Sequence, residues 1–544
     1  MTVGTAVGFG ISAAALGASA VLWCDACGVP LLQRECEACG DPGRVVGSNA
    51  MRPVFAEEVS LLREQFSAEF PSADEDFALW SIGRVYYRDG RALARVRGTH
   101  DFGLELLCQE HGAANRGLRP QAEVIRHLWR ANRTALDCLE YEAVGFIREA
   151  IHAAPERVPI VSYSTGKDSA VVSHLVMLAL GRADTIHVFG DTTIELPNTY
   201  QALEALPPAL SAAPLLTAYP RTGFFEMAAA IGPPSRVQRW CCTTHKTVPL
   251  SEMFRHINGD QGVLAFCGLR RSESLGRTSV PRVSRDTKIP VQVIANPILY
   301  WSTTAVWVYA LCHGVQINSA YRLGFTRVGC YPCPLNSAWS EFLIRTYYPG
   351  LYGEWQSALL QHAAHWHLGD SGTYVATGGW KGRVGGRSDA RASRYSLDRR
   401  PCLDTELACN YVLKGGWREH FTELLKPLGV LRVLSDDHQT ARLLLLRSGT
   451  QSPALLISVS RPRATVHVQY LSSDAQRTLQ ALVEAQIRKV QLCVGCGACA
   501  SLCPNGAIRL EGNVHRIDSR LCTHCLACIR RIRYGCLAAD SLHT

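Results

Sequence analysis

Cysteine spacing is the first sign of chemistry in this sequence, which holds 22 cysteines among 544 residues. A C-x-x-C pair lets two thiolates hold one metal ion from a single turn of chain. Two such pairs stand close together in the order C-x2-C-x8-C-x2-C, and they predict one tetrahedral site, with structural zinc favoured over iron. Its four ligands would be Cys24, Cys27, Cys36 and Cys39.

The neighbours Cys241 and Cys242, in "RWCCTTHK", raise a second question. Adjacent Cα atoms lie about 3.8 Å apart, short of the roughly 4.4–6.8 Å that disulfides prefer. We therefore expect no bond between the two thiols. Either two core residues happen to adjoin, or both thiolates serve one metal centre.

A phosphate-binding turn is predicted at "SYSTGKDSAVV". It follows a short apolar run and opens a helix, whose N-terminal amides and dipole favour an anion. The segment lacks the G-x4-G-K-[ST] order of a Walker A loop. The candidate nucleotide-binding residues are Ser164, Thr165, Gly166, Lys167, Asp168 and Ser169.

This turn resembles the PP-loop of the ATP pyrophosphatases, and three later segments resemble the phosphoadenosine phosphosulfate reductase branch of that superfamily. They are "GDTTIELPNTY" at 190–200, "GLRRSES" at 268–274 and the run from "NPILYW" to "GCYPCPL". Thr193 and Asn198 depart from the first pattern, where Gly and Glu are usual. The resemblance implies ATP with Mg²⁺ as substrate. It adds Asp191, Gly268, Arg270 and Glu273 to the nucleotide site and implies catalytic roles for Lys167, Asp168, Asp191 and Arg270.

The adjacent cysteines acquire a role from the same family. Cys241, Cys242, Cys330 and Cys333 form a C-C-x87-C-x-x-C set that resembles the [4Fe–4S] ligands of adenylyl-sulfate reductases. A zinc site and unliganded thiols are the alternatives, and Lys246 is expected near the metal and substrate. The reactive E-C-G-L-H element of those reductases has no counterpart in the final "YGCLAADSLHT", which counts against simple sulfate reduction.

The last sixty residues carry two more cysteine runs, and "CVGCGACASLCP" resembles the C-x2-C-x2-C-x3-C-P run of bacterial ferredoxins. The second run places seven residues, rather than three, before its last cysteine. A zinc-binding tail is the alternative; a ferredoxin-like tail would deliver electrons to another centre. By the resemblance, cluster one takes Cys493, Cys496, Cys499 and Cys536, and cluster two takes Cys503, Cys522, Cys525 and Cys528.

Short apolar runs alternate with helical patterns from residue 157 onward, which predicts βαβ units, a parallel sheet and ligands at the strand C-termini. The expected fold class is an α/β PP-loop core with a metal-binding ribbon, accessory α+β segments and a ferredoxin-like domain. The expected divisions are an apolar leader (1–22), the ribbon (23–48), an accessory α+β domain (49–150), the PP-loop domain (151–345), a helical extension with a Gly/Arg-rich loop (346–404), a small α+β domain (405–485) and the ferredoxin-like domain (486–544).

The composition is that of a globular protein, and the net charge of +9 permits an acidic partner without requiring one. The leader lacks the basic start of a signal peptide, and no long apolar stretch follows, so a cytoplasmic protein without a membrane partner is expected. A hairpin predicted around "RDGR" sets five arginines about Tyr86 and Tyr87, which suits nucleic acid; a solvated face is the alternative.

These features favour an ATP-dependent sulfur-transfer enzyme that adenylates an acceptor, as in DNA phosphorothioation proteins of the Dnd and Ssp type, which the chain resembles. The expected partners are a cysteine desulfurase as sulfur donor, an electron donor, and nucleic acid (DNA before tRNA) or DNA-modification subunits. Ferredoxin-coupled sulfonucleotide reduction and tRNA thiolation are the alternatives, and a non-catalytic electron-carrying subunit is a third reading.

Overall fold

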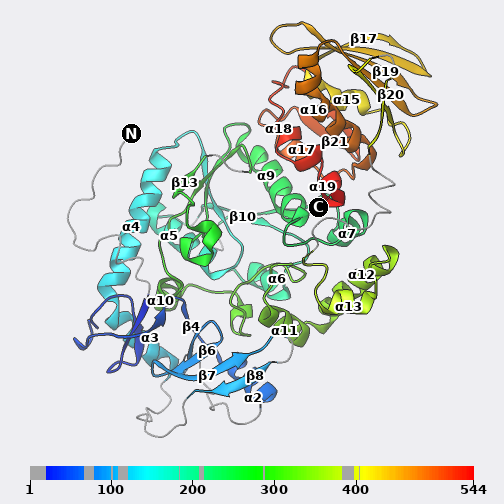
Figure 1. Ribbon diagram of the computed structural model, residues 1–544. Coiled ribbons are helices and arrows are strands. Elements are labelled where there is room, and N and C mark those ends of the chain that lie inside the picture. Colours follow the sequence, from blue (N-terminus) through cyan, green and yellow to red (C-terminus); the bar gives the residue numbers. More distant parts are fainter. Residues whose placement is uncertain are drawn as a thin grey trace.

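The computed structural model describes residues 20–66, 77, 79–99, 102–107, 120–182, 184–206, 213–285, 288–382, 397–402 and 405–543. Residues 1–19 of the expected leader and 383–396 of the expected Gly/Arg-rich loop lie outside these ranges. The N-terminal strands lie at one end of a central parallel sheet, and the C-terminal sheet and tail lie at the other (Figure 1). No helix in the described ranges is long and apolar enough to cross a membrane.

An antiparallel ribbon begins the described chain, and its first strand starts inside the segment expected to be a leader. It consists of β1 (Ala20–Cys24), β2 (Val29–Leu31) and β3 (Arg44–Ser48), in the order β2-β1-β3. Trp23 is buried and packs edge-on against Trp80 of the following sheet, with 6.3 Å between ring centroids. The ribbon therefore shares its core with that sheet.

The second sheet is antiparallel and carries the predicted hairpin. Its strands, in spatial order, are β4 (Met51–Pro53), β5 (Trp80–Ile82), β6 (Val85–Arg88), β7 (Arg91–Arg97) and β8 (Gly103–Leu106), with helix α2 (Ala56–Phe66) after β4. β6 pairs with β7, and Asp89 and Gly90 between them have φ values of +47° and +69°. Two positive φ values are what a tight hairpin turn requires, so the hairpin is confirmed.

One of the two tyrosines of this hairpin belongs to the core. Tyr86 is fully buried, and its hydroxyl donates to Glu58 Oε1 at 2.9 Å. Arg95 and Arg97 both pair with Glu105, at 3.7 and 2.6 Å. Nucleic-acid binding by the hairpin stays a prediction, with a solvated face as its alternative.

Helices α3 (Gln121–Ala131) and α4 (Arg133–His152) lead into the central sheet, whose order is β11-β10-β9-β12-β14-β13. Five strands are parallel, β9 (Val158–Ser162), β10 (Ile186–Gly190), β11 (Leu215–Ala218), β12 (Val263–Phe266) and β14 (Gln292–Ala295), and the edge strand β13 (Val283–Ser284) is antiparallel. The predicted α/β fold is confirmed. The chain leaves β9 for β10 on one side and later adds β12 on the other, so the end of β9 is a topological switch point, where ligands of such sheets bind.

Six α-helices connect and cover these strands: α5 (Lys167–Leu180), α6 (Pro197–Glu204), α7 (Phe224–Ile231), α8 (Trp240–Cys242), α9 (Val248–Asn258) and α10 (Thr303–Cys312). The helical extension follows as α11 (Ala338–Tyr347), α12 (Pro349–His365) and α13 (Ser371–Ala376).

A six-stranded antiparallel sheet precedes the cysteine-rich tail, in the order β15-β16-β20-β19-β18-β17. Its strands are β15 (Asp398–Pro401), β16 (Ala408–Val412), β17 (Val430–Asp436), β18 (Thr440–Leu446), β19 (Pro453–Ser460) and β20 (Thr465–Tyr470), with α15 (Phe421–Leu425) after β16. Helix α16 (Ser473–Leu492) then runs past residue 485, so one helix spans the expected boundary of the tail. The tail contains α17 (Ala498–Ser501), β21 (Ile508–Glu511), β22 (Val514–Ile517), α18 (Ala527–Arg530) and α19 (Leu537–His543).

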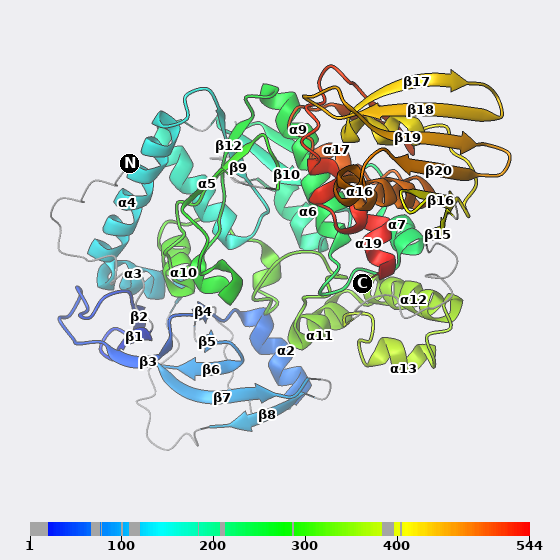
Figure 2. The same ribbon diagram turned by 45° about the horizontal axis from the view of Figure 1, so that its top comes forward.

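The tail docks on the central domain beside α7 and α9, as Figure 2 shows for α17 and α19. Arg255 of α9 donates to the carbonyls of Cys503 and Pro504, at 2.7 and 3.0 Å. Gln238 donates to Asp540 Oδ2 at 2.8 Å. One hydrophobic cluster spans the interface, so the tail is packed against the domain rather than tethered to it.

Candidate nucleotide and metal centres

The predicted phosphate loop lies at the switch point, between β9 and the N-terminus of α5. Ser169 Oγ donates to the Gly166 carbonyl at 2.9 Å, and the Ser164 amide donates to Ser169 Oγ at 3.2 Å, which closes the turn. Thr165 is buried and has a φ of +58°, a conformation that costs a β-branched residue of order 1–3 kcal/mol. Such strain persists only where surrounding contacts impose it, and strained residues of this kind cluster at active sites and ligand-binding sites.

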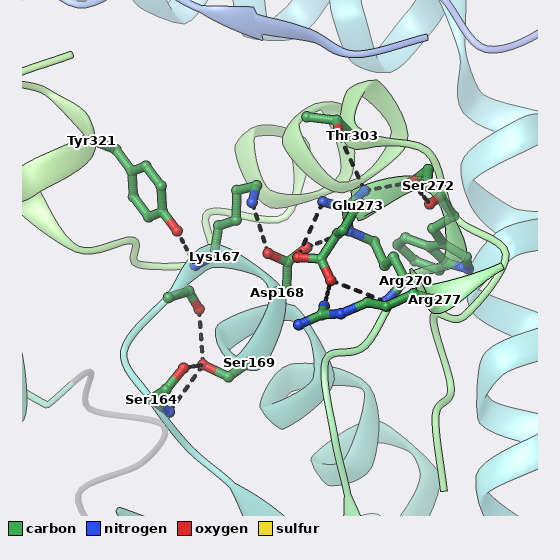
Figure 3. A network of polar contacts seen from close by, with 12 residues as sticks. Ser164, Lys167, Asp168, Ser169, Arg270, Ser272, Glu273, Arg277, Thr303 and Tyr321 are labelled. Atoms are coloured by element: carbon green, nitrogen blue, oxygen red, sulfur yellow. Dashed lines mark hydrogen bonds and ion pairs between the residues drawn. The ribbon is translucent and has the colours of Figure 1, made fainter. Parts of the chain in front are cut away.

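A partly buried carboxylate joins two cations at the start of α5 (Figure 3). Asp168 Oδ2 accepts from Lys167 Nζ at 2.7 Å, and Oδ1 accepts from Arg270 Nε at 2.6 Å. Burial would raise the pKa of Asp168, but the charges of Lys167 and Arg270 outweigh it and hold the pKa below its usual value. The carboxylate is therefore ionised, and two cations with one anion leave a net positive charge beside the loop.

The loop after β12 brings Arg270 to this network. A Cβ on Gly268 would lie 2.7 Å from the Asp168 backbone carbon, so only glycine permits this approach. Arg270 also donates to the hydroxyls of Ser272 and Thr303, at 3.0 and 3.1 Å. Glu273 caps the short helix η3 (Arg271–Glu273) and pairs with Arg277, so it orients the arginines rather than the loop.

Two residues that hold the loop were not selected as site residues from the sequence. The Lys167 amide donates to the Tyr321 hydroxyl at 3.2 Å, and Lys167 Nζ lies over the Tyr321 ring at 5.6 Å. Asn318 donates to Thr165 Oγ1 at 2.9 Å. Both belong to the N-x-x-Y element of the family-like run, which was the signal that could have identified them.

Asp191 lies at the end of β10, but its contacts serve its own turn. Its Oδ1 accepts from the Thr193 amide at 2.7 Å and from the Tyr200 hydroxyl at 2.9 Å. Thr193, which stands where Gly is usual in the family, has a φ of +62°. A catalytic role for Asp191 stays a prediction.

The adjacent cysteines lie on a distorted helix. Cys241 and Cys242 end α8, which continues into the π-helical turn Thr243–Thr247, a rare geometry found mostly at functional sites. Successive helical side chains point in different directions, which leaves Cys241 half-buried and Cys242 exposed. The Cys242 thiol, burial, Cys330 and Cys333 together raise the pKa of Cys241. The four predicted thiols thus interact electrostatically, although no three of their sulfurs all lie within 4.8 Å of one another, and their ligation stays a prediction.

Lys246 and Glu195 extend from this group toward the β10 loop. Glu195 is buried and lies 3.6 Å from Lys246 Nζ and 3.7 Å from Cys330 Sγ, and it also accepts from Thr192 at 2.9 Å. Burial would lower the pKa of Lys246, but Cys330, Glu195 and Cys242 raise it, so this amine stays charged. The expected position of Lys246 near the cysteines agrees with this geometry.

Exposed cations surround the four thiols. The pKa of Cys242 falls to about 6, chiefly because Cys241 donates a hydrogen bond to its sulfur and, against the effect of burial, because Lys246, Arg239 and Lys288 are near. Burial raises the pKa of Cys333, and the charge of Arg327 opposes that rise. Arg239, Lys288 and Arg327 are exposed, and none makes an ion pair with a carboxylate in the described part of the chain. Three exposed cations therefore lie beside the central thiols.

The N-terminal cysteines form a compact tetrahedral group. The sulfurs of Cys24 and Cys39 lie 3.5 Å apart and those of Cys27 and Cys36 lie 3.6 Å apart. Metal–sulfur distances of about 2.3 Å in a tetrahedron place the sulfurs about 3.8 Å apart, so the group fits one ion. Among the described residues, no other group of three or more His, Cys, Asp or Glu ligand atoms lies within 4.8 Å. The predicted mononuclear four-cysteine site is confirmed, and the choice between zinc and iron stays a prediction.

The tail cysteines interact with one another electrostatically. Burial raises the pKa values of these thiols most; Cys536 adds to the rise at Cys493 and Cys496, and Cys503 adds to it at Cys522 and Cys528. Cys499 of the first expected set also raises the pKa of Cys528 in the second, so these influences do not separate two ligand sets, and each set stays a prediction. Cys536 is buried, so its thiol is not presented to solvent.

Donors surround the tail sulfurs, as iron–sulfur ligation requires. The amides of Gly495 and Ala507 donate to the sulfurs of Cys493 and Cys503, at 3.4 and 3.3 Å. His515 Nε2 lies 3.3 Å from Cys499 Sγ. The residues present therefore fit iron–sulfur clusters.

Comparison with protein families agrees with this arrangement. Residues 158–336, which contain the phosphate loop and the four central cysteines, match the phosphoadenosine phosphosulfate reductase domain. This part of the chain is similar to a phosphoadenosine phosphosulfate reductase domain. Residues 485–531 match a 4Fe-4S dicluster domain, so one chain joins a reductase-like segment to a tail that is similar to an iron–sulfur domain. Cys536 lies beyond the matched residues, in line with its unusual spacing.

Relatives of the reductase domain include proteins with and without an assigned activity. An uncharacterized protein of Methanocaldococcus jannaschii is 32% identical over 252 residues, which are 46% of this chain and 51% of the relative. The adenosine 5′-phosphosulfate reductase of Geobacillus thermodenitrificans is 28% identical over 155 residues, which are 28% of this chain and 63% of the relative. The chain therefore covers 51% of the length of the first relative and 63% of the length of the second.

One solved structure is similar to part of this chain at low identity. The phosphoadenylyl-sulfate reductase of Candida auris, a phosphate complex, matches 36% of this chain and 95% of its own with 16% identity and a TM-score of 0.28.

Proposed function

We propose that this chain is an ATP pyrophosphatase-type sulfur-transfer enzyme that thiolates a nucleic acid, with DNA favoured over tRNA. The observation that carries the proposal is a set of three exposed cations near the central cysteines, Arg239, Lys288 and Arg327. Lys167 and Arg270 at the phosphate loop are buried and bind Asp168. In the described part of the chain the three exposed cations make no ion pair with a carboxylate, which suits a polyanion that extends beyond one nucleotide.

Adenylation is the first reaction in this proposal. An acceptor oxygen attacks the α-phosphorus of ATP, and the bond to the β-phosphate oxygen breaks to release pyrophosphate. The α5 N-terminus and Lys167 would stabilise the charge that develops on the leaving phosphates. Asp168 holds Lys167 and Arg270 in place, because both bind its carboxylate.

Sulfur transfer would follow, with a cysteine desulfurase as donor. A persulfide sulfur displaces AMP and leaves the acceptor joined to a cysteine by a disulfide. Two electrons and one proton then split that disulfide into the thiolated acceptor and a cysteine thiol. Iron–sulfur clusters, when bound, supply one-electron transfers, and the dicluster domain packed beside α7 and α9 suits that delivery.

Sulfonucleotide reduction is the second candidate, and the similarity to adenosine 5′-phosphosulfate reductases favours it. In that case the iron–sulfur tail would supply the two electrons that release sulfite and AMP from adenylyl sulfate. No ATP would be consumed.

One anaerobic experiment separates the two candidates. The full chain is incubated with α-labelled ATP, ³⁵S-cysteine, a cysteine desulfurase, titanium(III) citrate as a sulfur-free reductant and either duplex DNA or tRNA, and in parallel with ³⁵S-labelled adenylyl sulfate and the same reductant. Sulfur transfer predicts AMP, pyrophosphate and ³⁵S in the nucleic acid, in amounts that fall as salt rises. Sulfite from adenylyl sulfate without ATP turnover would replace this proposal with the second candidate.

A further inference from the structure

One lysine is buried in the tail without a carboxylate partner. Lys489 of α16 is 3% exposed, and its Nζ donates to the Cys528 carbonyl at 3.2 Å. Glu484, the closest acidic residue along α16, lies instead near Arg399 and Arg488, at 4.0 and 3.8 Å. In the described part of the chain, no carboxylate lies within ion-pair distance of Lys489 Nζ.

A buried ammonium group needs an anion, because removing a charge from water costs several kcal/mol unless a partner compensates it. The segments packed around Lys489 carry cysteines of both runs. The Cys493 amide donates to the Lys489 carbonyl at 2.9 Å, while Lys489 Nζ donates to the Cys528 carbonyl. Helix α16 also contacts α18, which holds Cys528, and α19, which follows Cys536, so Lys489 stands between the two expected ligand groups.

We infer that Lys489 is the shared counter-cation of the iron–sulfur clusters of the dicluster domain and that it raises their reduction potentials. Each cluster gains one negative charge when it accepts one electron. A fixed positive charge in a site of low dielectric constant stabilises the reduced form more than the oxidised form. This inference rests on the dicluster domain and not on the proposed sulfur transfer.

Lys426 offers a matched control at the edge of the same tail. Its Nζ pairs with Glu423 at 2.7 Å and donates to the Ile517 carbonyl at 3.2 Å. It is therefore a lysine beside the tail that has its own carboxylate, and its charge is already compensated.

The test compares Lys489→Met, Lys489→Arg and Lys426→Met in the full chain, reconstituted anaerobically with iron and sulfide. Iron per chain is counted, and the clusters are titrated with dithionite under electron paramagnetic resonance, one electron per cluster. Lys489→Met should lower the ratio of reduced to oxidised cluster at fixed potential about tenfold, which corresponds to about 59 mV for a one-electron couple. The other two variants should keep the wild-type potentials.

Loss of iron can also decide the question. If Lys489→Met loses iron while Lys489→Arg retains it, the charge holds the clusters and the inference stands. Full iron with unchanged potentials in Lys489→Met would overturn it. Equal loss of iron in both Lys489 variants would also overturn it, because shape rather than charge would then be what the site needs.

Discussion

Arg270 Nε lies 2.6 Å from Asp168 Oδ1, although the two residues are 102 positions apart in the chain. The contact joins the loop after β12 to the first turn of α5, and the same carboxylate also binds Lys167. It thereby fixes two cations beside the turn where a phosphate would bind.

Replacing Arg270 with glutamine should lower kcat/KM for pyrophosphate release by about 10²–10³, since preorganised charge at the leaving group is worth that much in comparable sites. Arg271→Gln is the neighbouring control, because Arg271 instead bonds to the Val280 carbonyl and packs on Tyr300. Release of pyrophosphate from ATP is measured for both variants. An equal loss of kcat/KM in both variants would show that Arg270 contributes no more to pyrophosphate release than its neighbour does.

Acid should destabilise the central domain through His245. This buried ring packs beside Phe224 and Trp240, and burial lowers its pKa to about 4. In the unfolded chain its pKa is about 6.5, so only the unfolded state binds the proton between pH 6.5 and 4. Stability should therefore fall as pH falls through that window, by about 3 kcal/mol in total from this group.

Urea unfolding at pH 7 and pH 4.5, followed by tryptophan fluorescence, checks this dependence. His245→Phe should reduce the difference in the free energy of unfolding between the two pH values. Asp168→Asn should leave it unchanged, because the lowered pKa of Asp168 keeps that carboxylate ionised in the folded state across the window and removes its contribution only at lower pH. A His245→Phe variant with the full wild-type dependence would assign the effect to other groups.

The N-terminal four-cysteine group should hold one metal ion independently of the clusters. Cys27→Ser should remove one equivalent of zinc, leave the iron content unchanged and expose the ribbon to proteolysis, because a structural ion contributes folding free energy directly. Cys138→Ser, a lone cysteine on α4, is the control and should change neither metal. Iron in place of zinc at this site would identify it as rubredoxin-like.

The buried pair of Arg52 and Glu58 should make the N-terminal sheet sensitive to single substitutions. Arg52 Nη2 lies 2.5 Å from Glu58 Oε1, and both side chains are buried. Arg52→Met should lower the free energy of unfolding by about 3–5 kcal/mol, because it leaves an unpaired buried carboxylate. Hydrogen exchange in β4–β7 reports the loss, and the double variant Arg52→Met/Glu58→Leu should recover much of it.

Several features of this protein could be predicted from short segments of its sequence. The spacing of the cysteines predicted the four-cysteine site of the ribbon, because its ligands come from two tight turns, and it predicted the dicluster domain in the same way. The alternation of short strands and helices predicted the parallel sheet, and "RDGR" predicted the hairpin turn. In each case the signal lies within the short segment that forms the ligand turn, the strand or the hairpin.

The tertiary structure decided what depends on residues far apart in the chain. It placed Tyr86 in the core, since strand alternation gives two faces without naming the buried one. It brought Asn318 and Tyr321 onto the phosphate loop and Glu195 between Lys246 and Cys330. Among the described residues, it also left Lys489 without a carboxylate partner. A buried charge can be recognised only when every neighbour is known, and those neighbours come from separate segments that packing alone brings together.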